Sequence, residues 1–93
     1  MIIGFIGLGL IAGSLAKTIK RIYPQACIIA TDPDRESVRL AIEAGIVERE
    51  VTQEYITSTE GLSELTYLFL CAPVITNIGL LEVISRNIGD RLF

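Results

Sequence analysis

A short apolar run at the start of the chain leads into three small residues at fixed spacing. The run, Ile2–Ile6, is rich in β-branched residues, which favours a buried strand. It leads into Gly7, Gly9 and Ala12 in a G-x-G-x-x-A pattern, and the apolar residues of Leu10–Ile22 then recur at helical spacing. Here the first glycine allows a tight turn, the second lets a phosphate approach the backbone, and the alanine lets helix and strand pack closely. The pattern predicts a strand–turn–helix unit whose helix begins beside a pyrophosphate, although a plain tight turn also explains the two glycines.

Apolar runs and helical periodicity alternate along the rest of the chain. Strands are predicted at Cys27–Thr31, 55–59 and 67–72, and helices at 34–44 and 76–88. Elements that alternate in this way form a parallel sheet with right-handed crossovers. We therefore expect an α/β fold, a Rossmann-type doubly wound parallel sheet with strand order 3-2-1-4. Because a full sheet of this type continues to a fifth and a sixth strand, we expect this one to be truncated.

Local signals mark the ends and the buried faces of the predicted helices. Asp34 is a predicted N-cap and Gly45 a predicted stop for the helix at 34–44. In the first and last helices, helical spacing predicts that one face packs on the sheet. The residues on those two faces are Ile11, Leu15, Ile19 and Ile22, and Ile78, Leu81, Ile84 and Ile88.

An acidic residue follows the second predicted strand. Asp32 lies twenty residues beyond Ala12, where a carboxylate can accept hydrogen bonds from the adenosine ribose and repels the extra phosphate of NADP. Together with the glycines, Asp32 predicts NAD as the cofactor. A helix cap or a solvated loop acid also explains Asp32. Arg35 is close enough to meet a 2′-phosphate, or it pairs with Asp32 or Asp34.

The fourth predicted strand ends at a proline. Ligands of open α/β sheets lie outside the carboxyl ends of the strands. We therefore expect Ala72, Pro73 and Val74 to border the ribose and nicotinamide half of the cofactor, with Thr76 near by. A strand terminator at Pro73 and a helix cap at Thr76 explain the same residues.

Composition excludes several classes of function. A net charge of −3 argues against a nucleic-acid partner, and the absence of histidine removes the commonest general base and metal ligand, so no metal site is expected. Cys27 and Cys71 lie in apolar runs and are expected to be small buried hydrophobes. The start of the chain lacks the basic region of a signal peptide, and no uncharged stretch is long enough to span a membrane. We expect a cytoplasmic protein with no membrane partner.

Residues 3–16 resemble the opening of the prephenate dehydrogenases and of the related arogenate (cyclohexadienyl) dehydrogenases. The distinctive piece is residues 10–16, and residues 41–47 and 70–74 are similar to the same family in order and spacing. Ala12 stands where many members carry glycine. These enzymes make tyrosine precursors with NAD or NADP, by oxidative decarboxylation of prephenate or arogenate. The resemblance covers nearly the whole chain.

The resemblance implies roles for particular residues. The pyrophosphate would be held by Gly7, Gly9, Leu10, Ile11 and Ala12, the adenosine ribose by Asp32, and the nicotinamide half by Ala72, Pro73 and Val74. The family's catalytic histidine and substrate-binding arginines lie beyond the matched region, so no catalytic residue is expected in this chain. Residues 1–93 would be an NAD-binding domain fragment, inactive alone, that lacks the C-terminal part of the sheet and the helical substrate and dimerisation domain.

Two other functions are also compatible with the sequence. The chain could be a stand-alone NAD(H)-sensing module that acts through a partner. It could also belong to another β-hydroxyacid-type NAD(P) reductase, although residues 13–16 set it apart from those enzymes. In any of these cases we expect a homo-oligomer, formed through the edge of the fourth strand or through the apolar face of the last helix.

Overall fold

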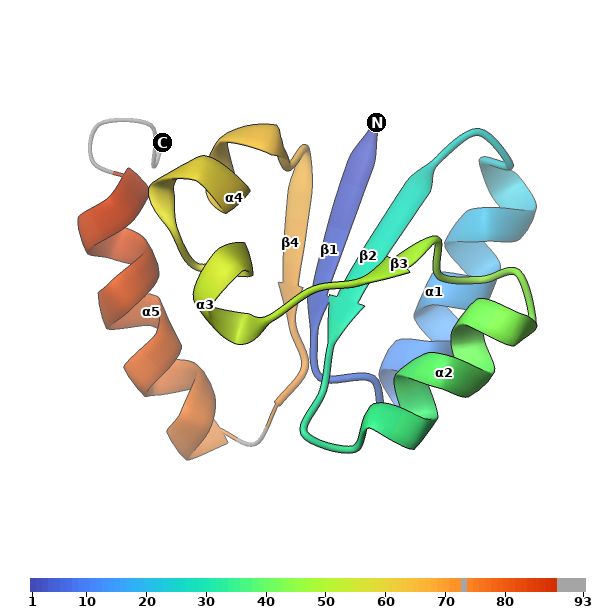
Figure 1. Cartoon of the computed structure of the whole chain (residues 1–93), viewed down its shortest axis with the longest axis horizontal. Helices are drawn as coiled ribbons and strands as arrows, with labels where there is room; N and C mark the ends of the chain where they lie inside the picture. Colours follow the sequence, from blue (N-terminus) through green and yellow to red (C-terminus); the bar gives the residue numbers. More distant parts are fainter. Residues whose placement is uncertain (73, 89–93) are drawn as a thin grey trace.

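Four parallel strands form the centre of the molecule. The computed structural model describes residues 1–72 and 74–88, and the side chains of residues 11, 74, 75 and 88 lie outside that description. The strands are β1 (Ile2–Ile6), β2 (Cys27–Thr31), β3 (Arg49–Glu50) and β4 (Tyr67–Leu70). They pair in the order β3-β2-β1-β4, all parallel (Figure 1). This confirms the predicted Rossmann-type order 3-2-1-4.

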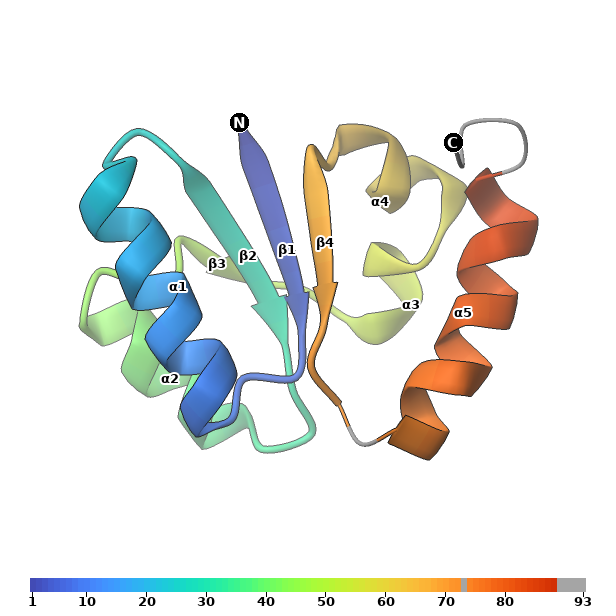
Figure 2. The same ribbon diagram turned by 180° about the vertical axis from the view of Figure 1, so that it is seen from behind.

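Helices cover both faces of the sheet, as Figures 1 and 2 show from opposite sides. One face carries α1 (Leu10–Ile22) and α2 (Arg35–Glu43), and the other carries α3 (Gln53–Ile56), α4 (Thr59–Glu64) and α5 (Val74–Ile88). Successive side chains of a strand point to opposite faces, so each layer has its own hydrophobic core. Phe5 therefore packs on the α1 side, while Ile6 packs on the α5 side.

The third strand does not lie where the sequence predicted it. Residues 55–59 were expected to be a strand, but they belong to α3, α4 and the turn between them, and β3 is the two-residue segment before them. The signals that reveal these helices are their N-caps: the Thr52 side chain accepts from the N–H of Tyr55, and Ser58 accepts from the N–H of Gly61. The prediction at 55–59 was wrong because the apolar pair at 55–56 belongs to a short helix.

The buried face of α1 also differs from the prediction. Ala12 and Ala16 face the core, and Ile19 packs against it, whereas Leu15 and Ile22 are exposed. Small residues bring the helix axis close to the sheet, so the close contact falls on alanines rather than on the larger side chains. The side chain at position 11 lies outside the described residues.

The last helix is rotated relative to the predicted face. Of the predicted face, Ile84 is buried in the second core, together with Leu80, but Ile78 and Leu81 are 63% and 55% exposed. The side chain of Ile88 lies outside the described residues. Either set of residues has helical spacing, because α5 carries apolar residues on most of its sides. Among the described helices, none has the length and apolar character needed to cross a membrane.

Candidate functional site

The carboxyl ends of the strands gather at one end of the molecule with the first turns of α1, α2 and α5 (Figure 1). Strand order reverses between β1 and β4, which is the point where open α/β sheets form a ligand crevice. The loop after β1 lies at this point.

Gly7 forms the turn from β1 toward α1. Its φ of +94° belongs to the left-handed region, which favours glycine. A Cβ atom at this position would lie 2.8 Å from the backbone nitrogen of Ala72 and 2.8 Å from the carbonyl carbon of Cys71. Gly7 is thus required both by its conformation and by the close approach of the chain beyond β4.

Gly9 is the N-cap of α1, and the space beside it is open. A Cβ built on Gly9 would meet no described heavy atom within 4 Å, and Gly9 lines a cleft. The first turn of α1 contains no acidic residue, whereas α2, α3 and α4 each carry a glutamate there. A helix N-terminus with free N–H groups and no competing carboxylate attracts an anion. The start of α1 therefore fits a pyrophosphate.

Two adjoining clefts run along this end of the sheet. The first has a volume of about 550 Å³ and is lined by Gly7, Gly9 and Ala72 among others. The second has a volume of about 540 Å³ and lies toward β3. Both are lined by residues 31–33, so Asp32 stands where they meet. Each volume lies within the usual range for small-molecule sites, about 300–1,000 Å³.

Asp32 holds the glycine loop in place. One carboxylate oxygen accepts from the backbone N–H of Leu8 at 2.6 Å, and the other accepts from the N–H of Asp34 at 2.8 Å. Each oxygen of a carboxylate has two acceptor sites, so both oxygens retain the capacity to accept a ribose hydroxyl. Asp32 does not cap α2; that role belongs to Asp34, as predicted, and Gly45 follows the helix with a φ of +76°.

The turn after β4 forms the far wall of the first cleft. Ala72 and Thr76 line it, while Pro73 lies outside the described residues and Val74 is described only as the first residue of α5. Because α5 begins at Val74, Thr76 is inside the helix and is not its N-cap. The side-chain amide of Asn77 donates to the carbonyl oxygens of Ala72 and Leu70, at 2.8 and 3.3 Å. Asn77 thus positions this wall, a role that no local sequence signal indicated.

The remaining predicted pyrophosphate residues sit at the start of α1. Leu10 is the first residue of the helix, and its side chain is 93% exposed and lines neither of the two clefts. Ile11 is the second residue of α1, and its side chain lies outside the described residues. Ala12 is buried in the core beneath the loop, as its packing role requires.

The cysteine prediction was wrong for Cys71 and met only in part at Cys27, which packs against the second core. Cys27 is half-buried, and Cys71 is exposed where it lines the first cleft. Nearby protein atoms still remove part of the water around the Cys71 sulfur, and this desolvation raises the pKa of the thiol. A raised pKa keeps Cys71 in the neutral thiol form near neutral pH, so it is a cleft wall rather than an activated nucleophile.

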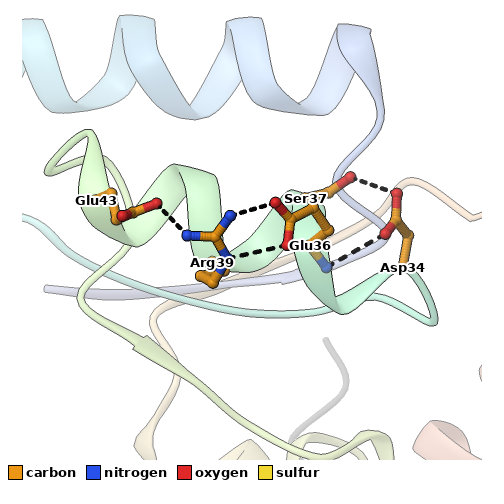
Figure 3. Close-up of polar contacts among 5 residues, drawn as sticks. All are labelled: Asp34, Glu36, Ser37, Arg39 and Glu43. Atoms are coloured by element: carbon orange, nitrogen blue, oxygen red, sulfur yellow. Dashed lines mark hydrogen bonds and ion pairs between the residues drawn. The ribbon is translucent and has the colours of Figure 1, made fainter.

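Arg35 pairs with neither of its predicted partners. Its guanidinium bonds the carboxylate of Glu50 on β3, with Nε–Oε2 and Nη2–Oε1 distances of 3.2 and 3.3 Å. The pKa of Arg35 is raised by these hydrogen bonds and by the charge of Glu50. Asp34 is turned instead toward the first turn of α2, where it accepts from the N–H of Glu36 and from the hydroxyl of Ser37 (Figure 3).

Two solved structures share this architecture. A prephenate dehydrogenase from A. aeolicus, crystallised with hydroxyphenyl propionate and NAD+, superposes with a TM-score of 0.72 at 24% identity over 92% of this chain. A probable dehydrogenase from Thermotoga maritima superposes with a TM-score of 0.71 at 19% identity over 94% of this chain. The chain has the fold found in these dehydrogenases.

This chain spans only 29% and 26% of the lengths of those two proteins. No protein-family model matches it. In the part of the chain that the structure describes, no group of three or more histidine, cysteine or acidic residues is arranged to hold a metal ion.

Proposed function

We propose that this chain is the NAD-binding portion of a dehydrogenase of the prephenate or arogenate type. The observation that carries the proposal is the junction of the two clefts. There a glycine turn opens onto a helix N-terminus free of acids, and Asp32 stands between the two halves of the site. The fold shared with a prephenate dehydrogenase that binds NAD+ supports the same conclusion.

The proposed roles follow the layout of the clefts. The N–H groups of the first turn of α1, from Leu10 to Ala12, bind the pyrophosphate, and Gly9 leaves room for it. Asp32 accepts from the adenosine ribose while it keeps the loop in place. Ala72, Pro73 and Val74 flank the nicotinamide half. When bound, NAD supplies the hydride acceptor.

The complete protein would add what this chain lacks. The sequence contains no histidine to serve as a general base. We propose that a further region of the protein supplies a base and arginines for the substrate carboxylates, and that the protein is a homo-oligomer. The reaction would be the oxidative decarboxylation of prephenate or arogenate, a step of tyrosine biosynthesis.

Isothermal titration calorimetry with NAD tests the proposal directly. We compare the parent with Gly9→Val and with Gly13→Val, because a Cβ at either glycine would meet no described atom within 4 Å. Only Gly9 lines the first cleft, while Gly13 lies one turn along α1. We expect NAD to bind the parent and Gly13→Val alike, and Gly9→Val to lose at least tenfold in affinity, about 1.4 kcal/mol.

Two results would contradict the proposal. One is a parent chain that binds no NAD at millimolar concentration. The other is a Gly9→Val variant that binds NAD as tightly as Gly13→Val does, since the pyrophosphate would then not pass over the loop.

A further inference from the structure

An ion pair stands at the rim of the second cleft. Arg35 comes from the start of α2 and Glu50 from β3, fifteen residues later, and both line the cleft together with Asp32. The Arg35 side chain is 82% exposed, so its guanidinium is free to exchange one anionic partner for another.

The charges around this cleft are unbalanced. Its lining contains two carboxylates, from Asp32 and Glu50, and a single guanidinium, from Arg35. The oxygens of Asp32 accept from two backbone N–H groups. Glu50 is therefore the carboxylate that neutralises the one cation of the second cleft.

We infer that Glu50 acts as a specificity residue that reserves Arg35 and so discriminates against NADP. This inference rests on the proposed function, because it assigns the second cleft to the adenosine half of the cofactor. Arginine binds phosphate through two parallel N–H donors, and Nε and Nη2 of Arg35 are the two that Glu50 occupies. A 2′-phosphate that binds this edge of the guanidinium has to displace Glu50, and it then lies beside two carboxylates that no cation neutralises.

Glu50 and Asp32 should leave different signatures in binding data. Asp32 would accept from a ribose hydroxyl, so removing its carboxylate weakens NAD binding and also reduces the repulsion of the 2′-phosphate of NADP. Glu50 acts on the phosphate alone, because NAD carries no charge at that position. Removing the Glu50 charge should therefore strengthen NADP binding and leave NAD binding unchanged.

The experiment measures NAD and NADP affinity for Glu50→Gln, Arg35→Gln and the double variant at low ionic strength. We expect NADP affinity to rise about tenfold in Glu50→Gln, a gain limited by the solvent exposure of Arg35. NAD affinity should stay within about twofold, and the double variant should return NADP binding to the parent level. Exposed ion pairs contribute little to folding, and circular dichroism checks that every variant keeps the fold.

Glu43→Gln is the matched control. Glu43 is the last residue of α2, the helix that begins at Arg35. It pairs with Arg39, which also bonds Glu36 (Figure 3). The substitution removes the same single charge from an exposed ion pair, but away from the clefts. It should leave both affinities unchanged.

The outcomes separate this inference from the proposed function. A parent chain that binds neither dinucleotide overturns both. NAD binding that persists while Glu50→Gln leaves NADP affinity unchanged overturns the inference alone. An equal gain in Glu43→Gln, or a gain that survives the loss of Arg35, also overturns it, because net charge rather than the released guanidinium would then be the cause.

Discussion

Replacing Asp32 by asparagine tests whether this side chain holds the glycine loop. The carboxylate serves two backbone donors, Leu8 N–H with one oxygen and Asp34 N–H with the other. An asparagine side chain has one oxygen and one NH2 group, so it can accept from only one of them. In either orientation, the NH2 group faces a backbone N–H and one hydrogen bond is lost.

The size of the loss follows from those two contacts. An unsatisfied donor that is buried costs about 1–3 kcal/mol, and the surviving bond no longer has a charged acceptor. Asp32 is half-buried, and its bond to Leu8 is partly shielded from water. We therefore expect Asp32→Asn to lower the free energy of unfolding by about 2 kcal/mol, which for a domain of this size shifts Tm by about 10 °C.

Asp34→Asn provides the matched control. Asp34 also accepts two hydrogen bonds, but one comes from the hydroxyl of Ser37, which can reverse and accept from an amide (Figure 3). Asparagine is as good an N-cap as aspartate, so this variant should lose less than about 1 kcal/mol.

Urea unfolding followed by circular dichroism measures both variants under the same conditions, with the midpoint and the m-value fitted separately. Equal stability losses in the two variants, or a loss below about 0.5 kcal/mol in Asp32→Asn, would refute the reasoning. Asp32 would then be a solvated loop acid, with no part in holding Leu8.

Three further predictions concern the cleft. Gly7→Ala should lower the free energy of unfolding by more than about 2 kcal/mol in urea, because an alanine at φ +94° is strained and its Cβ would lie 2.8 Å from backbone atoms. A smaller loss of stability would mean that the turn relaxes around the alanine. Iodoacetamide should alkylate Cys71 slowly near pH 7 and faster as the pH rises through the raised pKa of the thiol. Saturating NAD should protect Cys71 from alkylation, with half-buried Cys27 as the internal reference. An alkylation rate of Cys71 that NAD does not change would place the cofactor elsewhere. Residues 1–93 alone should produce no NADH from NAD and prephenate, since positioning of the substrate and a general base contribute many orders of magnitude in rate. Turnover by the parent that disappears in Gly9→Val would show that the catalytic groups lie within these residues.

Much of this protein was determined by the sequence alone. The apolar run Ile2–Ile6, the glycines that follow it and the helical period after them predicted β1, its turn and α1, and the structure confirms all three. The N-cap at Asp34 and the stop at Gly45 were found in the same way. These features depend on backbone conformation and on contacts within four residues, which neighbouring side chains encode directly.

Tertiary structure decided the rest. Helical spacing did not select the buried face of α5, because packing against the sheet outweighs weak local preferences. The two short helices α3 and α4 were also missed, although their N-caps are local signals. The ion pair of Arg35 with Glu50 and the hydrogen bond from the Leu8 N–H to Asp32 each join residues that are far apart in the sequence. Such contacts exist only once the crossovers have brought the strand ends together, so the cleft belongs to the fold rather than to any one segment.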